Sequence, residues 1–349
     1  MHLSDLWFIA IAVLWAGYFV LEGFDFGVGI LLPFLSRGDD MSKRVMINTI
    51  GPVWDGNEVW LLAGGGTLYF AFPNLYAQSF SGFYLPLMMV LWLLITRGIA
   101  IEFRNHLEDN LWRPFFDALF MLASALLAIF YGAALGNVVR GVPLDASGSF
   151  FLPLWTDFQP AGKAGILDWY TVLVGLLAFV TLTVHGALWI ALKNEDLLQH
   201  RARIIAKWAW GAVALLTAVV TLATFRVQPL VLHNLTTYIW GWVFPDLALA
   251  GLIAMLVFIL RGDDLKAFLS SCAFIAGMLT SAVFGIYPYV LPSNTDPRLG
   301  LTIANTQTSS YGLSVALVWF IPGMLLVLAY TVFIYRHFAG KVRLEEDGY

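Results

Sequence analysis

Long apolar segments alternate with short polar segments along the whole 349-residue chain. A helix that crosses a bilayer needs about 20 mostly apolar residues. Nine segments meet this requirement, and they predict nine transmembrane helices over residues 6–35, 51–72, 77–100, 111–136, 166–191, 204–225, 243–261, 266–290 and 310–336. The pattern therefore predicts an all-α polytopic membrane protein.

The segments form one predicted integral membrane domain over residues 1–349, without a separate soluble domain. Helices 1–4 occupy residues 6–136 and helices 5–9 occupy residues 166–336, with the longest loop, rich in proline and glycine, at 137–165. The first segment is longer than one span requires. Because it contains four residues that disturb helices, we expect it to bend near its end. These residues are Gly23, Gly27, Gly29 and Pro33.

Composition agrees with a membrane protein. Hydrophobic residues make up 60% of the chain and charged residues 12%, against about 25% charged residues in soluble domains. The single cysteine, Cys272, excludes a disulfide within the chain and any cluster of several cysteine ligands. The N-terminus lacks the basic region of a secretory signal, so we expect the first helix to be retained. Consecutive glycines at 64–66 are expected to let helices approach closely.

Basic residues predict the orientation, because cytoplasmic loops carry an excess of lysine and arginine. With nine helices, one side holds fifteen of the 19 basic residues and the other holds four. The larger set is Arg37, Lys43, Arg44, Arg97, Arg104, Arg113, Lys193, Arg201, Arg203, Lys207, Arg261, Lys266, Arg336, Lys341 and Arg343. The smaller set is Arg140, Lys163, Arg226 and Arg298. We therefore expect an external N-terminus and a cytoplasmic C-terminus.

Carboxylates collect at the predicted cytoplasmic ends of the first helices. Glu22 and Asp25 lie in the cytoplasmic half of the first helix, and Asp55 and Glu58 lie in the first two turns of the second. Intramembrane carboxylates are costly and are candidates for proton relays or ion paths. For Asp55 and Glu58, spaced i, i+3, the alternative is an acidic first turn that the helix dipole favours.

Aromatic residues surround these acids, and a basic residue lies at a similar depth. Trp54 and Trp60 bracket Asp55 with apolar surface, which favours the functional interpretation for that residue. Asp25 lies between two phenylalanines. Its structural alternative is an ion pair with Arg97 on the third helix, which would make both buried charges tolerable.

His185 is the only histidine that is clearly intramembrane. It could be a haem ligand, but a polar interhelical contact with Thr181 or Thr183 is the favoured interpretation. No pair of histidines has the spacing of metal ligands, so the sequence predicts no metal site and no redox centre in this chain.

Three stretches resemble subunit II of cytochrome bd quinol oxidases, including the cyanide-insensitive branch. They are "LEGFDFGVG" (21–29), "MINTIGPVWDGNEVWLLAGGGTLYFAFPNLYA" (46–77) and "SGFYLPLMMVLWLLITRGIAIEFR" (81–104). The resemblance extends along the whole chain and is most specific over residues 18–114. The turn "KNED" at 193–196 departs from the family pattern.

The resemblance implies a nine-helix fold of two four-helix bundles plus one peripheral helix, in the bacterial cytoplasmic (inner) membrane. Family members pair with a subunit I that carries the haems, here expected to be haem b and haem d. The complex oxidises quinol, reduces dioxygen to water and takes protons from the cytoplasm. A small accessory membrane peptide often joins it, and whether a structural quinone binds subunit II stays open.

Asp25 and Asp55 match the aspartates of the family motifs and are the proton-relay candidates, with Glu58 and Arg97 in support. A carboxylate near the cytoplasmic surface can collect protons and pass them inward, because apolar walls tune it for transfer. Apolar surface around Trp60 is a candidate path for dioxygen.

Two other functions are possible from the sequence. An ion-coupled secondary transporter using Asp25 and Asp55 predicts inverted repeats with broken helices in both halves. The acids of helices 1–4 have no counterpart in helices 5–8, which argues against it. A purely structural scaffold predicts that neutralising either aspartate affects assembly only.

Overall fold

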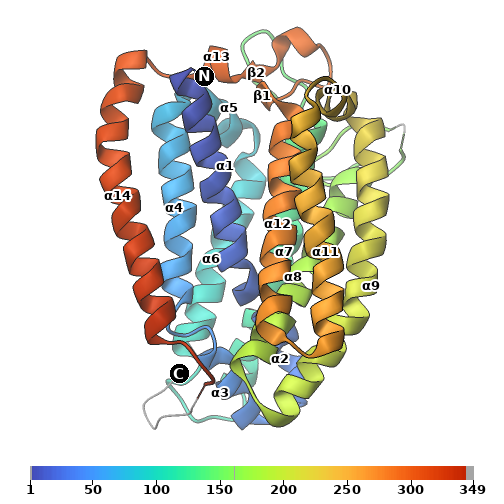
Figure 1. The fold of residues 1–349 in the computed structure, drawn as a ribbon. Coiled ribbons are helices and arrows are strands. Elements are labelled where there is room, and N and C mark those ends of the chain that lie inside the picture. The colour runs from blue at the N-terminus through green and yellow to red at the C-terminus, as the bar shows by residue number, and fades with distance from the viewer. Residues whose placement is uncertain (1, 161, 343–349) are drawn as a thin grey trace.

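The computed structural model describes residues 2–160 and 162–342. Arg343, counted above among the basic residues, lies outside this part of the chain. The long helices run side by side along one axis, with the N-terminus at the top of Figure 1 and the end of the last helix at the bottom. These two ends are called the upper and lower ends below.

The first half of the chain contains seven helices. They are α1 (Leu3–Leu21), α2 (Gly23–Ser36), α3 (Asp40–Asn48), α4 (Trp54–Ala71), α5 (Pro73–Gly82), α6 (Tyr84–Phe103) and α7 (Trp112–Arg140). The second half contains α8 (Trp169–Lys193), α9 (Asp196–Val227), α10 (Pro229–Thr237), η1 (Ile239–Trp242), α11 (Val243–Arg261), α12 (Asp264–Ile286), η2 (Pro297–Leu299), α13 (Ile303–Thr306) and α14 (Ser310–His337). A short antiparallel pair, β1 (Tyr289–Leu291) and β2 (Leu301–Thr302), joins α12 to α14.

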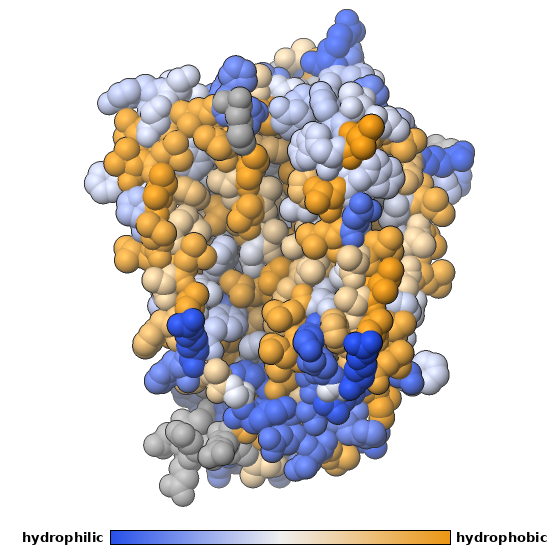
Figure 2. All heavy atoms as spheres, in the orientation of Figure 1, coloured by the Kyte–Doolittle hydropathy of each residue, from blue (hydrophilic) through white to orange (hydrophobic). Residues whose placement is uncertain are grey.

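Eight helical segments of the described chain are long and apolar enough to cross a membrane, with α1 and α2 together forming the first. On the face shown in Figure 2, apolar side chains cover the middle of the molecule and hydrophilic side chains gather at the lower end. The prediction of an all-α membrane protein is therefore confirmed. The ninth predicted span is α4, which is not among the eight and which begins with the polar residues Asp55, Asn57 and Glu58. A count of nine spans stays a prediction.

The first predicted helix is interrupted rather than bent near its end. α1 ends at Leu21, α2 begins at Gly23, and Pro33 lies inside α2 without ending it. The amide of Asp25 donates to the carbonyl of Glu22 across the break. The break therefore precedes the glycines and the proline from which a bend was expected.

α2 lies at the centre of the bundle and contacts both α7 and α8. Every residue of α2 is buried except Pro33 and Phe34. A Cβ atom on Gly27 would lie 2.7 Å from the Cα of Gly186 in α8, so the two backbones touch only because both residues are glycines. Of the glycines at 64–66, Gly64 is buried against Trp15 of α1, where a Cβ would lie 3.4 Å from Cε2, whereas a Cβ on Gly65 or Gly66 would meet no described atom within 4 Å.

Candidate functional site: a buried cluster of acids and arginine

The break between α1 and α2 brings two carboxyl groups into the protein interior. Glu22 and Asp25 are both 0% exposed. Because the amide of Asp25 bonds to Glu22, the carbonyl of Leu21 is free to accept a hydrogen bond from outside its helix. Asn57 of α4 supplies it, with Nδ2 at 3.1 Å from the Leu21 oxygen.

Asn57 also links Asp25 to the last helix. Its Nδ2 donates to Oδ2 of Asp25 at 2.8 Å. Its Oδ1 accepts a hydrogen bond from the Tyr335 hydroxyl of α14 at 2.9 Å. The side chain of Asn57 is almost completely buried, so one amide group connects α2, α4 and α14 inside the protein.

Arg97 of α6 is the only basic member of the site, and it is fully buried. It forms ion pairs with Glu22 and with Glu58, the latter at 2.9 Å from Nη1 to Oε1. Its guanidinium carbon lies 4.8 Å from the ring centre of Phe26 and 5.8 Å from that of Trp54. We call Glu22, Asp25, Asn57, Glu58 and Arg97 the acid–arginine cluster.

The predicted ion pair between Asp25 and Arg97 is wrong. Among the described residues, the carboxylates within 4 Å of the guanidinium are those of Glu22 and Glu58, whereas Asp25 is held by Asn57. The reason is the break before Gly23, which turns Glu22 toward α6 and leaves Asp25 facing α4. Sequence spacing placed Asp25 and Arg97 at one depth but did not give the rotation of the helices.

Several buried polar atoms of the cluster have no hydrogen-bond partner within the described chain. They are Oε2 of Glu22, Oδ1 of Asp25, and Nε and Nη2 of Arg97, whereas Oε1 of Glu22 contacts Nη1 of Arg97 in the ion pair. Buried polar groups are nearly always hydrogen-bonded to protein or to ordered water. The cluster also contains three carboxyl groups and a single guanidinium, so it is unbalanced in charge and in hydrogen bonding.

Asp55 lies on a different face of α4 from Asn57 and one helical turn from Glu58. Its side chain is exposed, whereas Trp54 and Trp60 are buried. The exposed face continues along α4 through Val59, Leu62, Gly66 and Tyr69, at alternating spacings of four and three residues. The structure therefore brings Asp25, Glu58 and Arg97 together and leaves Asp55 at the end of an apolar surface stripe.

Trp60 fills the contact between α4 and α1. A Cβ atom on Gly17 would lie 2.6 Å from Cε3 of Trp60, so the indole rests directly on the backbone of α1. This is a packing position, and a role in guiding dioxygen stays a prediction.

His185 of α8 makes the kind of contact that was expected, with different partners. The side chain is fully buried. Nδ1 lies 2.7 Å from the Ser271 hydroxyl of α12, and Nε2 lies 2.9 Å from the carbonyl oxygen of Val20 in α1. Thr181 and Thr183 were the wrong partners, and the Thr183 hydroxyl instead donates to the carbonyl of Phe179. With both ring nitrogens engaged, His185 does not fit the role of an axial haem ligand.

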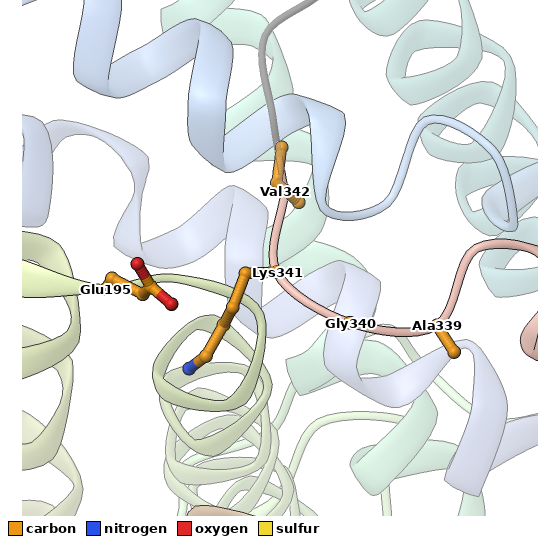
Figure 3. Close-up of a pocket in the computed structure, with 5 residues that line it drawn as sticks. All are labelled: Glu195, Ala339, Gly340, Lys341 and Val342. Atoms are coloured by element: carbon orange, nitrogen blue, oxygen red, sulfur yellow. The ribbon is translucent and has the colours of Figure 1, made fainter.

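Metal ligands and surface pockets were the other features that could mark a site. Over residues 2–160 and 162–342, no group of three or more histidine, cysteine or acidic side chains could hold a metal ion. One pocket lies at the lower end, between the start of α9 and the segment after α14 (Figure 3). It is lined by Glu195, Ala339, Gly340, Lys341 and Val342, and it contains none of the predicted site residues.

Asn57 and Tyr335 were not predicted as members of the site, and Glu22 was predicted only as one of several intramembrane carboxylates, without a partner of its own. The signal for Glu22 is an acid within an apolar segment. Tyr335 gives no such signal, because it lies 278 residues from Asn57 and its helix shows no polar stripe.

Known proteins resemble this chain over its whole length. A cytochrome bd ubiquinol oxidase subunit 2 of Bacillus subtilis is 33% identical over 99% of this chain and 98% of its own. The cytochrome bd-I ubiquinol oxidase subunit 2 of Escherichia coli K12 is 28% identical over 99% of this chain and 96% of its own. The solved structure of a bd oxidase from Geobacillus thermodenitrificans has the same fold, with a TM-score of 0.75 at 20% identity, covering 97% of this chain and 99% of that one.

These relatives give no support to the secondary-transporter alternative. The family model described as cytochrome bd terminal oxidase subunit II matches residues 3–338, nearly the complete chain. The chain therefore belongs to the cytochrome bd terminal oxidase subunit II family.

Proposed function

We propose that this chain is the second subunit of a quinol oxidase that reduces dioxygen to water, and that it supplies part of the route by which protons enter. The haems, b and d, belong to a partner subunit I, which also oxidises the quinol. The lack of a fitting axial ligand at His185 supports this division of labour. The observation that carries the proposal is the acid–arginine cluster.

The cluster has the properties of a proton store. If Glu22, Asp25 and Glu58 were all ionised, one guanidinium would leave a net charge of about minus two in an apolar interior, at several kcal/mol per uncompensated ion. Holding protons relieves this cost. Ordered water is the usual partner of buried polar atoms that lack protein partners, and each water needs two to four polar neighbours. Protons can then move between carboxyl groups through water.

Asp55 is the proposed entry to the cluster. It is one helical turn from Glu58, and Glu58 is 28% exposed while it contacts Arg97. The order Asp55, Glu58, Glu22 and Asp25 therefore leads from the protein surface to the buried interior, with the guanidinium of Arg97 holding Glu58 and Glu22 together. A carboxylate at the end of an apolar stripe is costly in lipid, so we propose that subunit I covers this face of α4 and that the proton path runs along the contact.

Orientation in the membrane is part of the proposal. Fifteen of 19 basic residues fall on the side predicted to be cytoplasmic, and this side corresponds to the lower end, where the acid–arginine cluster lies. A reporter fused after Tyr349, beyond the described residues, is expected to report a cytoplasmic location. A reporter inserted near Ala146 is expected to report an external one. An external signal from the C-terminal fusion would overturn both the orientation and the direction of the proton path.

The central experiment neutralises the two aspartates separately. Asp55→Asn and Asp25→Asn keep side-chain size and remove the titrating group. Each is expected to lower oxygen consumption per haem at least about tenfold, which corresponds to about 1.4 kcal/mol in the barrier. Asp55→Glu should keep part of the activity, because a carboxyl group remains.

Glu102→Gln is the matched control, since Glu102 is an exposed acid at the lower end of α6. It should behave like the wild type. The scaffold alternative predicts reduced assembly with normal turnover per haem in both aspartate variants, and that result would eliminate the proton role.

A small accessory membrane peptide and a structural quinone stay predictions from the family resemblance. Mass spectrometry of the purified complex would identify both, and a complex containing two polypeptides and no quinone outside subunit I would contradict them.

A further inference from the structure

α14 is a peripheral helix, with an attachment to the interior near its lower end. Within Ser310–His337, Leu313 is the only buried residue, and the helix stands at the edge of the bundle next to α4 (Figure 1). Tyr335, in its last turn, nevertheless reaches the acid–arginine cluster. Its ring packs edge-on against Trp189 with centroids 6.2 Å apart, and its hydroxyl lies 2.9 Å from Oδ1 of Asn57.

The hydrogen-bond pattern around Asn57 permits one orientation of its amide. Nδ2 faces two acceptors, Oδ2 of Asp25 at 2.8 Å and the carbonyl oxygen of Leu21 at 3.1 Å. Amide nitrogen and oxygen positions follow from such networks. A flipped amide would place Oδ1 against both of these oxygens. Tyr335 supplies the donor that the outward-facing Oδ1 requires, so the hydroxyl stabilises the orientation in which Asn57 donates to Asp25.

We propose that Tyr335 is a positioning residue for proton uptake, which acts through Asn57 to hold the carboxyl group of Asp25. This inference rests on the proposed function, in which Asp25 accepts protons. With Oδ2 of Asp25 bound by Asn57, the free atom is Oδ1, which has no partner among the described residues. The last helix thus sets which oxygen of Asp25 faces the proton path.

The test removes one oxygen atom. In the assembled complex, Tyr335→Phe is expected to lower turnover at saturating quinol by about threefold to tenfold, the range that follows from losing one hydrogen bond. The KM for quinol should stay unchanged, because the quinol site is proposed to lie in subunit I. Turnover is measured as oxygen consumption per haem, which normalises for assembly. Tyr311→Phe is the control, since Tyr311 is exposed at the upper end of the same helix.

A double variant separates positioning from packing. Asn57→Leu removes the link between Tyr335 and Asp25, so Tyr335→Phe should cause no further loss in that background. Independent, multiplicative losses would overturn the inference, as would a Tyr335→Phe variant that matches Tyr311→Phe.

Asp25→Asn in the same assay distinguishes the positioning role of Tyr335 from the proposed function. A large loss in Asp25→Asn with normal turnover in Tyr335→Phe would overturn the positioning role and leave the proposed function standing. Normal turnover in Asp25→Asn would overturn both.

Discussion

Two arginines are buried at opposite ends of this protein, and their surroundings differ. Arg140 closes α7 at the upper end, and Arg97 lies near the lower end of α6. Both would be expensive to bury without a partner. One is surrounded by a complete and balanced set of partners, and the other is not.

Each guanidinium nitrogen of Arg140 donates a hydrogen bond to a described acceptor. Its Nη2 donates to Oδ1 of Asn137 at 2.7 Å, its Nη1 donates to the carbonyl of Gly165 at 3.0 Å, and its Nε donates to the carbonyl of Gly141 at 3.2 Å. Asp168 supplies the single matching charge. The other oxygen of Asp168 accepts from the amides of Tyr170 and Thr171 and thereby caps α8.

Arg97 shares its cluster with three carboxyl groups, contacts two of them, and leaves Nε and Nη2 without a described partner. A balanced, closed network ties α7 to α8 and to the loop between them, and its two charges compensate each other. An unbalanced network with spare donors and acceptors can bind water and change its protonation. The two arginines indicate that a buried charge does not by itself mark a functional site. A buried charge marks such a site when its neighbours do not match it in charge and in hydrogen bonds.

The largest expected effect is at the balanced network. Asp168→Ala removes the partner of a buried arginine, at about 3–5 kcal/mol, and also an N-cap, at about 0.5–2 kcal/mol. Thermal loss of the haem spectrum from the purified complex should shift to a clearly lower temperature, with normal turnover per haem before unfolding. Asp145→Ala, in the exposed loop at the same end, is the control. Reduced turnover with unchanged thermal stability would contradict the purely structural role of the Arg140–Asp168 pair.

The next effect concerns the partner of Arg97. Arg97→Gln should cost about 3–5 kcal/mol, because it leaves buried carboxylates uncompensated. Glu22→Gln in the same chain should restore much of the complex yield, and Asp25→Asn should restore less, because Glu22 contacts the guanidinium and Asp25 does not. Yield is measured as haem recovered per unit of membrane protein. Strictly additive losses with Glu22→Gln would count against the ion pair.

The smallest effect is expected at His185, a third buried polar side chain, whose two ring nitrogens both have partners. His185→Ala loses two hydrogen bonds, worth about 0.5–1.5 kcal/mol each, and stability should fall modestly. The visible spectrum of each haem should stay unchanged, since both imidazole nitrogens are already engaged. Selective loss of one haem from an otherwise assembled complex would show that His185 is a ligand after all.

Much of the architecture could be predicted from the sequence, because the cost of placing polar backbone and side chains in lipid is local. The lengths of the apolar segments gave the membrane helices, with α11 beginning and ending at the predicted residues. The same local rule identified Asp25, Glu58 and Arg97 as unusual, and the resemblance of their surroundings gave the family. α4 is the one predicted span that is not among the eight long apolar helices of the described chain. The polar residues that it contributes to the site lower its hydropathy.

The sequence by itself determined which residues lie at the lower end and which elements carry them. Only the tertiary structure decided which of them touch. Partners depend on how each helix is rotated about its axis, and that rotation follows from distant packing such as the contact of Gly27 with Gly186 and from the break at Glu22. His185 meets Ser271 across 86 residues, and Tyr335 meets Asn57 across 278. Local hydropathy does not predict such pairings, because they depend on how all the helices of the bundle pack together.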